Sequence, residues 1–158
     1  MKKCPCFRQS DPGAGLKSGF RIREEHDEVR KQKILIVDDD EGVREMLADF
    51  FGVIGYQSIV ASNGKEALGL LEKHDVSLVI SDIKMPVMDG IEMLKQIKKK
   101  RPDLIVILIT GYEPDYSWNL AKEAGAWDYV RKPFNIDVIE RKVRFLLDKK
   151  NDGRASEG

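Results

Sequence analysis

The chain has 158 residues, of which 42% are hydrophobic, so it can bury one substantial core but is too short for two ordinary domains. Its 27 Lys and Arg residues balance its 27 Asp and Glu residues, yet residues 1–33 hold nine Lys or Arg against five Asp or Glu, which leaves the rest of the chain net negative. A body of that sign offers no broad basic face, which argues against duplex DNA as a direct partner.

Residues 1–32 show no sustained hydrophobic period, which predicts a mostly disordered basic tail with at most a short helix near its end. Cys4 and Cys6 both lie in this tail, and two thiols one residue apart cannot fill a tetrahedral zinc site, so we expect exposed thiols without a function. No signal-peptide apolar stretch follows Lys2 and Lys3, and the longest apolar run, 104–109, cannot span a membrane. A soluble, cytoplasmic protein is therefore expected.

From residue 33 onward, short apolar runs alternate five times with segments of helical period. Strands are expected near 33–37, 57–61, 77–81, 104–109 and 127–130, each followed by a helix. Four of these runs are rich in Ile, Leu and Val and are typical of strands buried on both faces, whereas the more polar run at 57–61 suits an edge. The alternation predicts an α/β fold, a doubly wound parallel sheet with helices on both faces.

The helices are expected to begin at small polar residues that cap their first turns. Asp40 is the expected cap of the first helix and Asn63 of the second, while the third helix should start at Asp89 or Gly90 and the fifth after Asn135. The fourth, near 114–124, has a thin apolar stripe and should be the loosest. Residues 150–158 are expected to be a disordered C-terminal tail. The inward-facing residues of the four strongly patterned helices are expected to be Val43, Met46, Leu47, Phe50 and Ile54; Ala67, Leu68 and Leu71; Ile91, Leu94 and Ile97; and Ile136, Ile139, Val143, Leu146 and Leu147.

Polar side chains follow four of the predicted strands. Asp38 and Asp39 follow the first, Asp82 the third and Thr110 the fourth, while Lys132 comes shortly after the fifth. The carboxyl ends of parallel strands meet at one edge, so these groups should lie close together. Two carboxylates about 4 Å apart repel by roughly 4 kcal/mol at an effective dielectric near 20, so such a cluster needs a cation, and oxygen ligands favour Mg²⁺.

Beside a cation, Asp82 can act as a nucleophile and form an aspartyl phosphate, while Lys132 and Thr110 stabilise the oxygens of the transferred group. Each residue alone has an ordinary explanation as a helix cap, a strand-end hydroxyl or a solvated charge, and Asp40 is expected to be only a cap. Their joint occurrence at successive strand ends predicts a site for a metal and a phosphoryl group.

These motifs resemble the receiver domain of two-component response regulators, over about Lys33 to Lys149. The resemblance is carried by the Asp38-Asp39 pair, the pattern Asp-x-x-Met-Pro-x-Met-Asp-Gly at 82–90, Thr110 and Lys-Pro-Phe at 132–134. It implies a flavodoxin-like five-stranded sheet in the order 2-1-3-4-5 with five helices, and a commonly cis peptide bond between Lys132 and Pro133.

By this likeness, Asp82 is the phosphoacceptor and, with Asp38, Asp39 and the backbone carbonyl of Lys84, belongs to the Mg²⁺ site. Asp39 would be a direct ligand, whereas Asp38 would reach the metal directly or through water. Lys132 and Thr110 would contact the phosphoryl group.

The resemblance further implies a switch. Tyr129 would turn inward as the Thr110 hydroxyl moves toward the phosphate, so that the face built by the fourth helix, fifth strand and fifth helix binds partners differently. Lys84 and Tyr112 occupy the variable positions that tune how fast water removes the phosphoryl group.

The expected function is that of a stand-alone phosphoacceptor that catalyses only its own phosphorylation and dephosphorylation. The phosphoryl group would come from a histidine kinase or a histidine phosphotransfer protein, because only His26 and His74 occur in this chain, one in the tail and one late in the second helix. A downstream target protein is implied, and pairing of two copies is left open.

Three alternatives remain at this point. In a phosphatase of the haloacid dehalogenase type, Asp38 and Asp40 would be the paired acids, but Gly42 does not match and a cap insertion is missing. A phosphorylation-independent interaction module would leave the intact site unexplained. A receiver within an assembly that senses a membrane or an acidic partner would use the basic tail.

Overall fold

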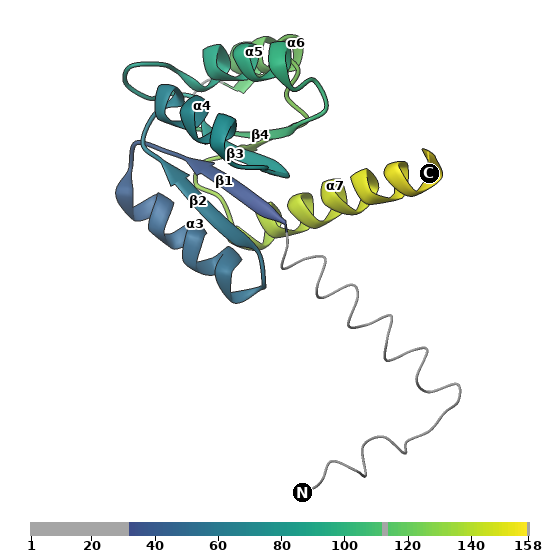
Figure 1. Ribbon diagram of the computed structural model, residues 1–158. Coiled ribbons are helices and arrows are strands. Elements are labelled where there is room, and N and C mark those ends of the chain that lie inside the picture. Colours follow the sequence, from purple (N-terminus) through teal and green to yellow (C-terminus); the bar gives the residue numbers. More distant parts are fainter. Residues whose placement is uncertain (1–31, 112–113, 158) are drawn as a thin grey trace, which may run out of the picture.

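The computed structural model describes residues 32–111 and 114–157 (Figure 1), although not the side chains of 114–117 or 153–157. The predictions made for the tail ahead of residue 32, for Cys4 and Cys6, and for Tyr112 lie outside the described residues.

A five-stranded parallel sheet forms the centre of the molecule, and its order, β2-β1-β3-β4-β5, confirms the predicted flavodoxin-like topology. The strands are β1 (Lys33–Val37), β2 (Gln57–Ala61), β3 (Leu78–Asp82), β4 (Ile105–Thr110) and β5 (Asp128–Arg131). In the register, Val37 lies opposite both Ala61 and Ser81, and Thr110 lies opposite Arg131. The carboxyl ends of the strands therefore meet at one edge of the sheet.

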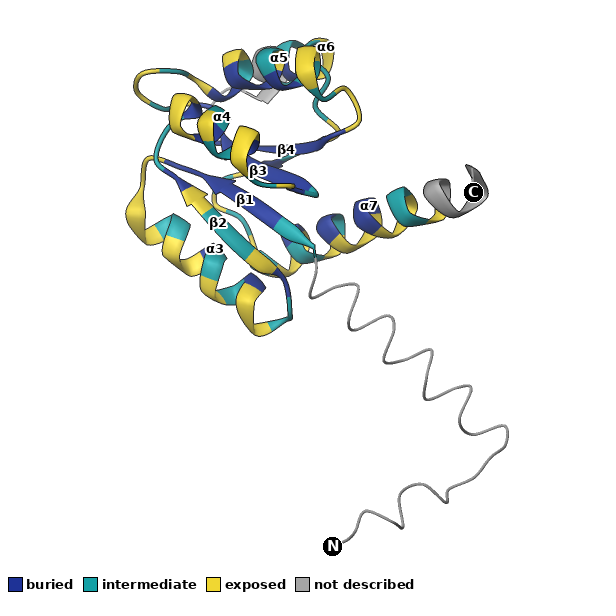
Figure 2. Cartoon of the chain, viewed as in Figure 1, coloured by how far each residue is buried: buried dark blue, intermediate teal, exposed yellow. Residues whose placement is uncertain are grey.

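Helices cover both faces of the sheet (Figure 1). They are α3 (Glu41–Val53), α4 (Gly64–Lys73), α5 (Gly90–Lys100), α6 (Pro114–Ala124) and α7 (Ile136–Glu157). Successive strand residues point to opposite faces, so Ile34 and Ile36 pack with α3 and α7, whereas Leu35 and Val37 pack with α4, α5 and α6. The two cores leave the outer helix surfaces exposed (Figure 2).

Polar caps begin the helices where the sequence predicts them. Asp40 accepts the Val43 amide at 3.3 Å, Asn63 accepts the Glu66 amide at 2.9 Å, and Asp89 accepts the Glu92 amide at 2.8 Å. Each cap satisfies an amide that has no partner within its own helix. The caps fix where each loop at the carboxyl edge of the sheet gives way to a helix.

The inward face of α3 differs from the prediction. Met46 is 44% exposed, whereas Phe51 is fully buried and was not expected to be. Phe51 packs edge-on against Tyr56, which ends the turn after the helix, with ring centroids 5.8 Å apart. The apolar side of α3 that meets the sheet is therefore centred on Leu47 and Phe51, one position later than predicted. This side of the helix packs near the edge strand β2. Met93 of α5 is likewise buried without having been predicted.

Two further predictions need correction. The run that forms β5 was expected to be buried on both faces, but β5 is an edge strand in which only Val130 is buried. Residues 150–158 were expected to be disordered, yet α7 continues to Glu157. The apolar period of this helix stops at Leu147, but beyond it Lys150 Nζ donates to the Ser77 carbonyl at 3.4 Å. Within the described part of the chain, no helix is both long and apolar enough to cross a membrane.

Candidate functional site

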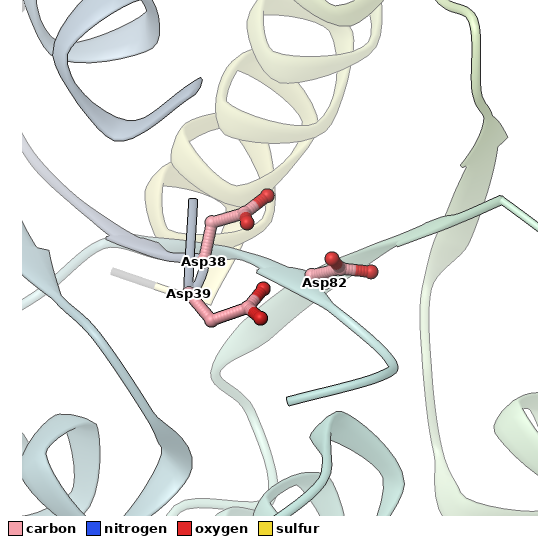
Figure 3. A group of neighbouring side chains, drawn as sticks. All are labelled: Asp38, Asp39 and Asp82. Atoms are coloured by element: carbon pink, nitrogen blue, oxygen red, sulfur yellow. The ribbon is translucent and has the colours of Figure 1, made fainter. Parts of the chain in front are cut away.

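Three carboxylates converge at the carboxyl edge of the sheet. Asp38 and Asp39 follow β1, and Asp82 is the last residue of β3. One oxygen of each side chain lies within 4.8 Å of the others. Asp38 and Asp39 both point toward the side on which Asp82 lies (Figure 3). Asp38 and Asp82 are buried and Asp39 is exposed, so the cluster is open to solvent on one side.

The loop after Asp82 folds back closely over the strand end. The Gly90 amide donates to the Ile83 carbonyl at 2.8 Å, and a Cβ at position 90 would lie 2.3 Å from the Asp82 carbonyl oxygen. Only glycine fits this approach. At the tip of the loop the Met88 amide donates to the Pro86 carbonyl at 2.7 Å, and Val87 between them adopts a φ of 71°.

Asp38 is the most constrained of the three acids. Its Oδ1 accepts the Asp40 amide at 2.9 Å, but its Oδ2 is buried and accepts no hydrogen bond from any described residue. Burial raises the pKa of the Asp38 carboxyl; the Asp40 amide bond lowers it, the Asp82 charge raises it, and the smaller effects of Lys132 and Asp39 oppose each other. Burial therefore outweighs the Asp40 amide bond and the charge of Lys132, and it disfavours the ionised form of this side chain.

Lys132 brings the opposite charge into the cluster. Its Nζ lies 3.0 Å from Asp82 Oδ2, a hydrogen bond, and 3.5 Å from Asp38 Oδ2, an ion pair. Burial lowers the pKa of Lys132, but the hydrogen bond and charge of Asp82, together with the charge of Asp38, outweigh it and leave the pKa raised. The peptide bond between Lys132 and Pro133 is cis, as the resemblance implied.

Thr110 lies beside Lys132 at the end of β4. It is buried, and its carbonyl accepts the Lys132 amide at 2.7 Å. A Cβ at the next residue, Gly111, would still be 3.9 Å from the Lys132 side chain, so space is left at this position. Lys84 is exposed in the loop that follows Asp82. The structure thus brings together the side chains of Asp38, Asp39, Asp82 and Lys132, with Thr110 at the end of the neighbouring strand and Lys84 in the loop after Asp82.

Tyr129 lies on β5, the edge strand that pairs with β4. It is half-buried on β5 opposite Leu108, and its ring stacks on Trp118 of α6, with centroids 4.4 Å apart and planes 30° apart. Tyr129 also lines a pocket of about 380 Å³ between β5 and the start of α7, together with Phe134 and Val138. Neither the stack nor the pocket was predicted, because both depend on how α6 and α7 dock on the sheet.

Sequence reasoning also missed Arg44. This residue of α3 donates from Nη1 to the Asp38 carbonyl at 2.7 Å. The only signal in the sequence is an arginine six positions after Asp38, near enough to reach back over the first turn of the helix.

A divalent cation that prefers oxygen ligands fits this site. The buried Oδ2 of Asp38 without a hydrogen bond, the raised pKa of that side chain, and three carboxylates within 4.8 Å together call for positive charge beyond that of Lys132. Ligands of this kind with few protein donors are those of Mg²⁺.

Comparison with known proteins decides the family. The sequence model of one protein family, the response regulator receiver domain, matches residues 34–144, which is more than half of the chain. The chain belongs to the response regulator receiver family. The receiver is 41% identical over 124 residues to sporulation initiation phosphotransferase F of Bacillus subtilis, a match that covers 78% of this chain and 100% of that protein. The match covers the whole length of this relative, which agrees with the prediction of a single receiver domain.

Solved structures agree with this assignment. Response regulator protein TrrA of Thermotoga maritima, solved in complex with Mg²⁺ and BeF, is 40% identical with a TM-score of 0.67, over 73% of this chain and 98% of that one. A receiver domain protein of Clostridium thermocellum is 29% identical with a TM-score of 0.72, over 76% of this chain and 97% of that one. Other relatives are longer, and the chain spans only 25% to 50% of several of them. The receiver is thus a phosphoryl-accepting module of two-component signalling.

Proposed function

We propose that this receiver accepts the phosphoryl group on Asp82, with Mg²⁺ bound beside it, and so switches a protein-binding face. The observation that carries the proposal is the position of Asp82. Its carboxylate is at a strand end, bound by Lys132 at 3.0 Å and within 4.8 Å of two further acids. Such a carboxylate has a cationic group ready for the incoming phosphoryl oxygens and a neighbouring place for a metal.

In this proposal Asp38, Asp39, Asp82 and the Lys84 carbonyl hold Mg²⁺. When bound, the cation supplies positive charge that offsets the mutual repulsion of the acids and attracts phosphoryl oxygens. The buried Oδ2 of Asp38 supports its inclusion among the ligands, because it accepts no hydrogen bond from a described residue and its ion pair with Lys132 is 3.5 Å long.

The transfer is a displacement at phosphorus. An Asp82 oxygen forms a bond to phosphorus while the bond from phosphorus to a donor histidine nitrogen breaks, and that nitrogen keeps the electron pair. Lys132 and the Thr110 hydroxyl bind oxygens of the transferred group. The donor belongs to a histidine kinase or a phosphotransfer protein, because the sequence has only His26 and His74, and His26 precedes the receiver module. His74 lies at the C-terminal end of α4, whereas a Cβ at the first residue of that helix, Gly64, would meet Met88 of the loop after Asp82.

The added charge then shifts the conformational population of the domain. A phosphoryl group carries nearly two negative charges, which Lys132 and the cation pair best in one arrangement. Thr110 would move toward it and Tyr129 would turn inward, changing the face made of α6, β5 and α7. We assign this module to residues 33–149, and propose a cytoplasmic location and a downstream protein target that reads the face, with pairing of two copies as one way of using it.

A phosphatase of the haloacid dehalogenase type is not favoured. Its second acid would be Asp40, but the Asp40 carboxylate accepts the Val43 amide as the cap of α3 and is not among the clustered acids. Gly42, in the place of the expected Thr or Val, is exposed in the first turn of that helix.

The test is phosphorylation by a small-molecule phosphoryl donor, read as the intact mass of the protein. The wild type should gain one phosphoryl group with Mg²⁺ and none with a chelator, and Asp82→Asn should gain none. Asp89→Asn is the matched control, because Asp89 is an exposed acid seven residues away that caps α5. If Asp82→Asn is modified as fast as the wild type, the proposed acceptor is wrong.

A further inference from the structure

Arg44 is tied to the backbone of the acidic cluster. Its side chain is partly buried, and its Nη1 donates to the Asp38 carbonyl at 2.7 Å, just beyond the last paired residue of β1, Val37. We propose that Arg44 is a positioning residue for the metal site, which fixes the Asp38 peptide so that Asp38 and Asp39 present their carboxylates to Mg²⁺. This inference rests on the proposed function.

Asp38 is held by three separate parts of the fold. Its amide donates to the Ala61 carbonyl of β2 at 3.2 Å, and its Oδ1 accepts the Asp40 amide at 2.9 Å. The guanidinium of Arg44 supplies the third bond, from α3. The single polar atom of Asp38 without a hydrogen bond among the described residues is Oδ2, on a side chain that is 2% exposed. Each of the three bonds thus restricts where that oxygen points.

The hydrogen bond from Arg44 to the Asp38 carbonyl is the one that the pairing of β1 with its neighbouring strands cannot supply. Val37 is the last residue of β1 that pairs with β2 and β3, so the chain turns at Asp38. Asp39 follows immediately and shares the peptide whose carbonyl Arg44 binds. Without the guanidinium the Asp38 carbonyl would lose this hydrogen bond, and the peptide that joins the two acids would be held less tightly.

Arg44 meets the acidic cluster at the backbone. Its Nη1 donates to the Asp38 carbonyl at 2.7 Å, and among the described residues its guanidinium forms no ion pair with Asp38, Asp39 or Asp82.

A purely electrostatic role and a positioning role predict opposite changes in Mg²⁺ affinity when Arg44 is replaced. A cation near a metal site repels Mg²⁺, so if charge alone mattered, removing Arg44 would tighten binding. If Arg44 positions the ligands, removing it loosens the site and weakens binding, as losses of groups that orient metal ligands commonly do by about tenfold or more.

Arg101 provides a matched control. Its guanidinium also donates to a backbone carbonyl, that of Leu71, at 2.6 Å and in a partly buried setting. It lies at the C-terminal end of α5, whereas the first residue of that helix, Gly90, contacts the Asp82 carbonyl. Replacing Arg101 therefore removes an equivalent bond far from the acidic cluster.

The experiment measures the Mg²⁺ dissociation constant by calorimetry on the full chain, and the melting temperature without divalent cation. Arg44→Met and Arg44→Gln should each weaken Mg²⁺ binding about tenfold, while Arg101→Met should leave it unchanged at a comparable loss of melting temperature. Arg44→Lys, which keeps a long donor, should recover part of the affinity. Binding by Arg44→Met and Arg44→Gln that is as tight as, or tighter than, that of the wild type overturns the inference.

Asp39→Asn separates this inference from the proposed function. If Asp39→Asn loses Mg²⁺ binding and the Arg44 variants keep it, Arg44 has no positioning role but the metal site stands. If Asp39→Asn and the wild type bind Mg²⁺ equally, the metal site itself is misplaced and the proposed function fails.

Discussion

The Lys132 ammonium lies 3.0 Å from Asp82 Oδ2, although β3, which Asp82 ends, and β5, which Lys132 follows, are separated in the sheet by β4. The long side chain crosses the end of β4 and reaches the acid from beyond Thr110. The same ammonium is 3.5 Å from Asp38 Oδ2, so one cation serves two buried carboxylates. Replacing Lys132 should change the rate of phosphorylation more than replacing any charged residue at the surface.

Lys132→Met should therefore slow phosphorylation by a small-molecule donor about 100-fold, because a preorganised donor to the transferred group is lost. Time courses of intact mass measure the rate. Lys142→Met is the control, since Lys142 is also partly buried and paired with an aspartate, Asp128, away from the acids. Equal rates for the two variants would remove Lys132 from the proposed role.

Asp38→Asn should stabilise the metal-free protein at neutral pH by up to about 1 kcal/mol, because removing a buried carboxylate whose Oδ2 accepts no hydrogen bond outweighs the loss of its 3.5 Å ion pair with Lys132. The pH dependence has a definite sign. The pKa of Asp38 is raised above its ordinary 3.8, so the folded chain holds this proton longer than the unfolded one. Its contribution to stability is greatest below that value and falls as pH rises through the raised pKa.

Denaturant unfolding in chelator at several pH values measures both effects. Asp38→Asn should lack the decline above pH 3.8 that this group causes in the wild type. A variant less stable than the wild type at neutral pH would show that the carboxylate is compensated after all.

Gly90→Ala should destabilise the protein by about 1–3 kcal/mol and reduce phosphorylation, because the new methyl group would be 2.3 Å from the Asp82 carbonyl oxygen. Gly69→Ala should do the opposite. Gly69 is inside α4, and a Cβ there would meet nothing within 4 Å, so alanine should stabilise the helix by about 0.5–1 kcal/mol. Thermal unfolding of both variants checks the pair, and tolerance of alanine at position 90 would contradict the close approach.

The stack of Trp118 on Tyr129 gives a spectroscopic test of the switch. In a Trp127→Phe background, Trp118 is the one remaining tryptophan, since the sequence has two. If Tyr129 turns inward, its ring leaves the 4.4 Å stack and the fluorescence of Trp118 should change on phosphorylation. The signal should be lost in the Asp82→Asn variant. Unchanged fluorescence in a protein shown by mass to be phosphorylated would argue against movement of Tyr129.

The features that could be predicted from sequence are those with a local signal. Asp40, Asn63 and Asp89 each precede an apolar period and each caps a helix, and Asp82 ends an apolar run and ends a strand. Once alternation of strands and helices indicates a parallel sheet, the meeting of strand ends follows from topology.

The features that could not be predicted depend on how elements dock. Met46 and Phe51 are both apolar, and the packing of α3 on the sheet and against Tyr56 decides that Phe51 is the buried one. The bond from Arg44 to Asp38 and the stack of Trp118 on Tyr129 join elements whose distance the sequence does not specify. Beyond Leu147, α7 contacts the rest of the fold through the polar bond of Lys150 to the Ser77 carbonyl, and a contact of this kind leaves no hydrophobic pattern.

Asp82 and Lys132 are 50 residues apart in sequence, and Asp38 and Asp39 come from yet another strand end. An unfolded chain scatters these groups and cannot hold a cation among them, so a cation bound there favours only the folded form. Free magnesium in the surroundings would then act as a thermodynamic stabiliser of the domain before any signal arrives. Its depletion would raise the unfolded fraction available to proteases and lower the amount of protein that can be phosphorylated.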